Sequence, residues 1–180
     1  MAVHRFVLLC LLVGQQRCSA ESVFAAVARD DAAAVTSLAV GDALNAKGPG
    51  GQSPLMHAVL TGKPVAVGAL LKLGADPTVA EQDGYTPMHG AGFQGRAAIA
   101  TMLVAAGLDP SDRHRDGFTP LHRACWGGDA RHTETVVVLL EAGVSPGEKS
   151  SDGKVCAQVT QNAGTLSALK AWQEKGGKDL

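Results

Sequence analysis

The sequence lacks the features that identify several common classes of protein. Its 180 residues contain 16 lysines and arginines against 17 acidic residues, and the basic residues form no cluster. Because a nucleic-acid groove needs clustered positive charge to meet the phosphates, we expect no nucleic-acid partner. No paired carboxylates, activated serine or cysteine–histidine arrangement stands out, so we expect no catalytic site.

Long apolar runs are also scarce. One run, at residues 6–13, is too short to cross a bilayer, which takes about 20 residues. It follows His4 and Arg5 and precedes the small residues of Cys18-Ser19-Ala20, which is the three-part pattern of a secretory signal peptide. We therefore expect residues 1–20 to be removed and the mature chain, with no membrane span, to lie in the secretory pathway or outside the cell. The alternative is a cytoplasmic protein in which this segment is a buried capping helix.

The C-terminal end offers less information about the compartment. Lys178-Asp179-Leu180 is similar to an endoplasmic-reticulum retention signal but lacks its glutamate. Neither asparagine, Asn45 or Asn162, begins an N-glycosylation sequon. Retention in the endoplasmic reticulum is left open.

What the sequence does contain is a short motif that recurs every 33 residues. It reads Gly-x-Ser/Thr-Pro-Leu/Met followed by methionine or histidine, and its three copies begin at Gly51, Gly84 and Gly117. Each copy continues through a short apolar helix, a glycine turn, a second apolar helix and a closing glycine. Self-similarity at such a period predicts a solenoid.

These repeats resemble the ankyrin repeat, and the resemblance covers nearly all of the chain after residue 20. It implies an all-α solenoid of helix-turn-helix repeats joined by hairpin-like turns. We expect full repeats at 51–83, 84–116 and 117–152, between degenerate capping repeats at 21–50 and 153–180. Atypical terminal repeats are usual, because their outer faces meet water rather than a neighbour.

The third full repeat is longer than the period. The distance from Gly117 to Gly153 is 36 residues, three more than expected, and the excess falls at 129–132. Because this segment separates the two helices of the repeat, we expect a longer turn there and an undisturbed stack.

Cysteine is rare, and two of the four cysteines lie in the predicted signal segment. Cys125 and Cys156 remain, and an oxidising compartment would permit a bridge between them. Their repeat positions differ by five residues, an axial offset of about 7.5 Å along a helix. Added to about 8–10 Å between packed helices, that offset places them beyond disulfide reach. We expect two separate buried thiols.

Two apparent ligand motifs have structural explanations. His89 and His122 occupy the repeat histidine position, which the resemblance implies bonds to the turn backbone. Their side chains are expected about 10 Å apart, too far to share a metal ion. Residues 90–95 match G-x-G-x-x-G but lie within a helix rather than between a strand and a helix. We therefore expect no metal and no cofactor.

Aromatic residues are few, and four of them occupy only two positions of the repeat. Tyr85 and Phe118 follow the turn glycine, whereas Phe93 and Trp126 end the first helix. The resemblance implies that both positions line the concave surface that binds partner proteins. Aromatic side chains are favoured as interface anchors because they bury a large area at low entropic cost.

The predicted function is therefore non-catalytic binding of another protein by a monomer. The predicted partner-binding residues are these four aromatics with a polar rim of Gln94, Arg113 and Arg115. One alternative is that the aromatics only pack against neighbouring repeats, which would leave a structural or regulatory scaffold without a partner surface. A second is an enzyme with a site on the solenoid.

Overall fold

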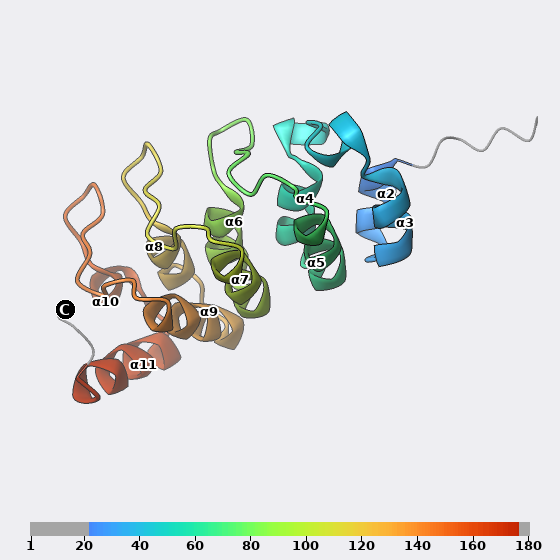
Figure 1. Cartoon of the computed structure of the whole chain (residues 1–180). Coiled ribbons are helices and arrows are strands. Elements are labelled where there is room, and N and C mark those ends of the chain that lie inside the picture. Colours follow the sequence, from blue (N-terminus) through green and yellow to red (C-terminus); the bar gives the residue numbers. More distant parts are fainter. Residues whose placement is uncertain (1–21, 177–180) are drawn as a thin grey trace, which may run out of the picture.

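The computed structural model describes residues 22–176, which form a row of stacked helix pairs (Figure 1). The N-terminal pair is α2 (Val23–Ala28) and α3 (Ala32–Leu38), followed by the short 3₁₀ helices η1 (Gly41–Leu44) and η2 (Pro49–Gly51). The later pairs are α4 (Pro54–Thr61) with α5 (Pro64–Lys72), α6 (Pro87–Gln94) with α7 (Ala97–Ala105), α8 (Pro120–Cys125) with α9 (Ala130–Glu141), and α10 (Cys156–Val159) with α11 (Ala163–Glu174). This order confirms the predicted all-α solenoid.

The predicted signal segment and the C-terminal Lys178-Asp179-Leu180 lie outside the residues that the structure describes. Within the described part, no helix is both long and apolar enough to cross a membrane.

The first helix of each full repeat begins at a proline, whose missing N–H needs no partner at that position. The residue before the proline is used in two ways. Ser53 Oγ accepts a hydrogen bond from the Met56 N–H at 3.1 Å, as an ordinary N-cap does. Thr119 Oγ instead lies 2.8 Å from His122 Nδ1, within hydrogen-bond distance. In the third full repeat the hydroxyl at this position therefore contacts the histidine ring, whereas in the first full repeat it accepts a hydrogen bond from a backbone N–H.

The hairpin before each full repeat is closed by two backbone hydrogen bonds. In the second copy the Glu81 N–H donates to the Tyr85 carbonyl and the Gly84 N–H donates to the Glu81 carbonyl, both at 3.0 Å. Equivalent pairs surround Gly51, Gly117 and Gly153. Gly84 has φ of +92°, a conformation that a residue with a Cβ rarely adopts, and Gly51, Gly117 and Gly153 also have positive φ, which explains why a glycine recurs at this turn position.

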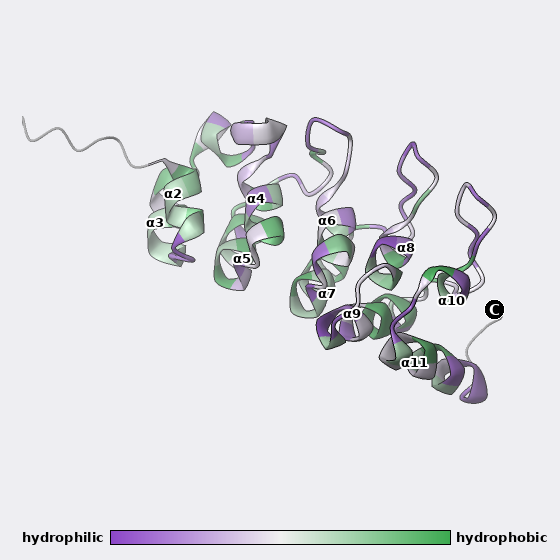
Figure 2. Cartoon of the chain, turned by 180° about the vertical axis from the view of Figure 1, so that it is seen from behind, coloured by the Kyte–Doolittle hydropathy of each residue, from purple (hydrophilic) through white to green (hydrophobic). Residues whose placement is uncertain are grey.

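A continuous apolar core runs along the stack. Each full repeat contributes at least one fully buried side chain from its first helix and one from its second, including Leu55 and Leu70, Met88 and Leu103, and Leu121 and Leu139. Figure 2 shows hydrophobic residues concentrated on the helices and hydrophilic ones along the hairpin loops. Burial between neighbouring repeats, rather than within one repeat, holds such a stack together.

The prediction of a longer turn in the third repeat is confirmed, since four residues separate α8 from α9 against two in each earlier full repeat. Residues 130–132, however, were predicted to lie in that turn and instead belong to the second helix, which is longer. Helix α9 has 12 residues, whereas α5 and α7 have nine each, and all three begin two residues after the turn glycine. The added helical turn has a partner in the preceding repeat. His132 Nε2 lies 3.2 Å from the Phe93 carbonyl oxygen, near the end of α6. The stack is preserved, as expected.

Cys125 and Cys156 form a disulfide, with their Cα atoms 5.6 Å apart, so the prediction of two separate thiols is wrong. The prediction placed successive first helices in register, but the end of one lies beside the first turn of the next. The same arrangement occurs one repeat earlier, where a Cβ on Gly92 would collide with the Pro120 carbonyl oxygen. The bridge joins the third full repeat to the C-terminal capping repeat.

Candidate partner-binding site on the first-helix face

We use the term first-helix face for the surface formed by α4, α6, α8 and the hairpins that precede them. Arg123, on α8, is buried at its centre with 9% of its surface exposed. Its guanidinium carbon lies 4.8 Å from the Tyr85 ring centroid, 5.2 Å from that of Phe118 and 4.6 Å from that of Trp126. Cations within about 6 Å of a ring centroid are attracted by the ring's negative face. One arginine therefore joins three of the four predicted aromatics.

Asp116 balances the charge of this arginine. Its carboxylate accepts hydrogen bonds from Arg123 Nη2 and, at 3.0 Å, from the Tyr85 hydroxyl. The Tyr85 ring also stacks on His114, with centroids 3.9 Å apart. Burial raises the pKa of Asp116, but hydrogen bonds from His114, the Phe118 N–H and Tyr85, together with the charge of Arg123, hold that pKa well below its usual range. The cluster is thus charge-balanced, and its polar contacts fix the position of the Tyr85 ring.

The four aromatics differ in exposure. Phe93 is 56% exposed and Trp126 is 43% exposed, whereas Tyr85 and Phe118 are partly buried. Phe118 packs against Trp126, with ring centroids 4.9 Å apart. Packing against neighbours, the alternative considered for all four, describes Tyr85 and Phe118. Phe93 and Trp126 present large apolar surface to solvent.

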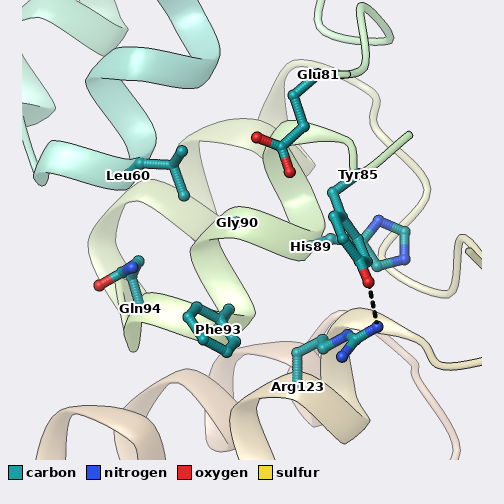
Figure 3. Close-up of a pocket in the computed structure, with 8 residues that line it drawn as sticks. All are labelled: Leu60, Glu81, Tyr85, His89, Gly90, Phe93, Gln94 and Arg123. Atoms are coloured by element: carbon teal, nitrogen blue, oxygen red, sulfur yellow. Dashed lines mark hydrogen bonds between the residues drawn. The ribbon is translucent and has the colours of Figure 1, made fainter. Parts of the chain in front are cut away.

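A pocket of about 340 Å³ opens beside this cluster, over α6 (Figure 3). Its lining comes from α4, α6, α8 and the hairpin between the first two full repeats, and consists of Leu60, Glu81, Tyr85, His89, Gly90, Phe93, Gln94 and Arg123. The floor includes bare helix backbone at Gly90, where a Cβ would lie 3.2 Å from Leu60 Cδ2. The pocket therefore combines apolar walls with a carboxylate and an amide side chain.

The sequence analysis did not identify Glu81 or Arg123 as site residues. Glu81 is partly buried, and burial raises the pKa of its carboxyl, as does the charge of Asp83, while His114 lowers it. Its carboxylate has no hydrogen-bond or ion-pair partner among residues 22–176. A signal was present in the repeat alignment, because the corresponding position three residues before the other turn glycines holds glycine, histidine or serine.

The predicted rim residues are dispersed. Gln94 lines the pocket. Arg113 instead joins two hairpins, donating to the Lys149 carbonyl at 2.9 Å and to the Glu148 carboxylate at 2.7 Å. Arg115 is exposed on the hairpin before the third full repeat. The structure thus brings Gln94 to the aromatic cluster, whereas Arg113 is occupied with a structural contact.

The two repeat histidines are buried, and each lies within hydrogen-bond distance of the threonine that precedes its helix. His122 Nε2 lies 3.1 Å from the Glu148 carbonyl, which confirms for this residue the implied bond to a turn. Burial lowers the pKa of His122, although nearby backbone carbonyls raise it, and burial likewise lowers the pKa of His89, against the charge of Asp112. No group of three or more potential metal ligands occurs within the described part of the chain.

Comparison with known families agrees with this architecture. Residues 23–114 match the family model for ankyrin repeats in three copies, and residues 116–151 match the model for an ankyrin repeat. No curated protein matches the chain. Ankyrin repeats are generally modules of protein–protein interaction and are typically non-catalytic. With more than half of its residues matched, the chain belongs to the ankyrin-repeat family.

Proposed function

We propose that this protein binds another protein through the first-helix face, with Phe93 and Trp126 as its anchors. The observation that carries the proposal is the exposure of both large aromatic side chains, with Phe93 in the lining of the pocket and Trp126 packed on the Arg123 cluster. Exposed aromatics on a preorganised surface lose little conformational entropy when they are buried by a partner. This surface is the one that the resemblance predicts to be concave and to bind partners.

The packed members of the cluster support the anchors rather than contact the partner. Arg123 lies beneath Trp126 and is itself held by Asp116 and Tyr85. A side chain fixed in this way does not have to be ordered when the partner arrives. Phe93 is held in place differently. It lies in the last turn of α6, and its backbone carbonyl oxygen lies 3.2 Å from His132 Nε2 in the next repeat.

Selection of a displayed random-peptide library on the purified protein tests this proposal. Peptides selected on the unmodified protein are expected to lose binding to the Phe93→Ala and Trp126→Ala variants, each by about tenfold or more, as truncated anchors do. Val65→Ala is the matched control, because Val65 is 52% exposed on the second helix α5. Peptides that bind all three variants equally well would contradict the proposal.

Thermal unfolding separates binding from packing. Phe93 is 56% exposed, so its truncation is expected to change the stability of the protein little. Truncation of Trp126 removes one ring of the Arg123 stack and its contact with Phe118, so it is expected to lower the free energy of unfolding by about 1–2 kcal/mol while the protein stays folded. A large fall in stability, with no peptide selected, would favour the alternative of a scaffold without a partner surface.

We also propose that the protein works in the secretory pathway or outside the cell. The predicted signal peptide at residues 1–20 motivates this proposal, and the Cys125–Cys156 disulfide supports it, because disulfides persist in oxidising compartments. Mass spectrometry of the mature N-terminus tests it. A chain that begins at Glu21 is expected, and an intact Met1 in the cytosol would overturn it.

A further inference from the structure

We propose that the pocket over α6 receives a lysine or arginine side chain of the bound protein segment, with Glu81 as its anionic partner. This inference rests on the proposed function, because it assigns a chemical class to one contact of the same surface. The observation that carries it is that one pocket is lined both by the unpaired carboxylate of Glu81 and by the exposed aromatic ring of Phe93.

The charges around the pocket favour a cation. Glu81 is partly buried, has no partner among the described residues, and lies near a second carboxylate, that of Asp83. A partly desolvated carboxylate beside a like charge gains from any cation that approaches it. The positive charge of Arg123, on the opposite side of Tyr85 in Figure 3, is already met by Asp116.

An acidic guest fits the same pocket poorly. It would face the carboxylates of Glu81 and Asp83, and it would compete with Asp116 for Arg123, which also lies against three aromatic rings. The other titratable groups nearby are His89, which is buried, and His114, whose Nε2 lies 3.0 Å from the Asp83 carbonyl. Both rings are already in polar contacts, His89 Nδ1 at 2.8 Å from Thr86 Oγ1 and His114 Nδ1 at 2.9 Å from an Asp116 carboxylate oxygen.

The walls match the stem of a long cationic side chain. Lysine and arginine carry three or four methylene groups that pack on apolar surface while the charged end stays polar. Leu60 and Phe93 provide such a surface, and Gly90 contributes helix backbone to the lining. The exposed Phe93 ring adds an aromatic face on which a guanidinium can stack.

Small probes test the pocket without a known partner. N-acetyl-arginine methylamide is titrated into the ¹⁵N-labelled protein, and the amide signals of Gly90, Phe93 and Gln94 are followed by NMR. N-acetyl-lysine methylamide and N-acetyl-glutamate methylamide are titrated in the same way. The two cationic probes are expected to shift these signals in a saturable manner, and the acidic probe is not.

Two matched variants locate the charge. Glu81→Gln keeps the shape of the side chain and is expected to weaken binding of the arginine probe by about fivefold, as a partly exposed ion pair would. Glu134→Gln changes an exposed glutamate on α9 and is expected to have no effect. An arginine probe that leaves the three signals unmoved, or that binds the Glu81→Gln variant equally well, overturns the assignment.

Selected peptides distinguish this inference from the proposed function. Peptides that bind through Phe93 and Trp126 are expected to be enriched in lysine or arginine, and selection on a Glu81→Lys variant is expected to enrich aspartate or glutamate instead. Peptides that depend on both aromatics but show neither enrichment would refute the cation pocket and leave the proposed binding surface intact. A selection that never depends on the aromatics would refute the proposed function itself.

Discussion

Reduction of the disulfide between Cys125 and Cys156 is expected to loosen the C-terminal capping repeat selectively. The bridge spans 31 residues of sequence and links α8 to α10. A loop of that length corresponds to a chain entropy of about 12 cal/mol/K, or about 3.7 kcal/mol of stability at 25 °C in the loop-closure treatment. Helix α10 has only four residues and lacks the Ser/Thr-Pro start of the other first helices, so other local contributions there are small.

The loss should be local, because each repeat of a solenoid contacts only its neighbours. Hydrogen exchange measured by mass spectrometry on the oxidised and reduced protein follows it. Amides of α11 (residues 163–174) are expected to lose protection on reduction, while those of α4 to α7 keep theirs. Alkylation before and after reduction provides the control, since the bridged cysteines react only after it.

Two outcomes would refute this reasoning. Alkylation of both cysteines in the folded, unreduced protein would show that the bridge does not form. Equal protection of α11 in the oxidised and reduced proteins would show that the bridge does not hold the capping repeat.

Three further substitutions or conditions test other parts of the account. Arg123→Lys keeps the charge but loses the planar group that lies against three rings, so the free energy of unfolding is expected to fall by about 1–2 kcal/mol in a denaturant titration; an unchanged value would contradict the role of the stack. Gly92→Ala places a Cβ against the next repeat's backbone and is expected to cost about 1–3 kcal/mol, whereas Gly68→Ala meets only a flexible methionine end and should be neutral or stabilising. Burial lowers the pKa of His89 and His122, so the unfolded state binds protons that the folded state does not. Stability is therefore expected to fall as the pH drops below about 6.5, by up to about 1.4 kcal/mol per pH unit for each histidine, and a melting temperature that stays constant from about pH 8 to about pH 5 would contradict this.

The repeat period predicted the fold well because each copy carries its own local signals. The proline that begins the first helix of each full repeat, the glycine of each turn and the apolar stripe of each second helix act over a few residues, so each can be recognised from the local sequence. The same period misled where neighbouring repeats meet. Cys125 and Cys156 are close because successive first helices are staggered, which depends on packing between repeats and not on spacing within one.

The site was only partly predictable for a related reason. Tyr85, Phe93, Phe118 and Trp126 were found because they recur at two repeat positions, and their contribution to binding stays a prediction. Arg123 recurs at no position, since glycine and histidine occupy its place in the other full repeats. Its importance arises from rings supplied by two hairpins and the end of α8, which only the folded chain brings together.

The central claim is that partner binding depends on the exposed aromatics of the first-helix face. Isothermal titration of one selected peptide against the unmodified protein, the Phe93→Ala/Trp126→Ala double variant and the Val65→Ala control tests it most directly. The account predicts a loss of affinity of about a hundredfold or more in the double variant, two anchors at roughly tenfold each, and none in the control. Equal affinity for all three proteins, each shown by its melting curve to be folded at the temperature of the titration, would contradict it.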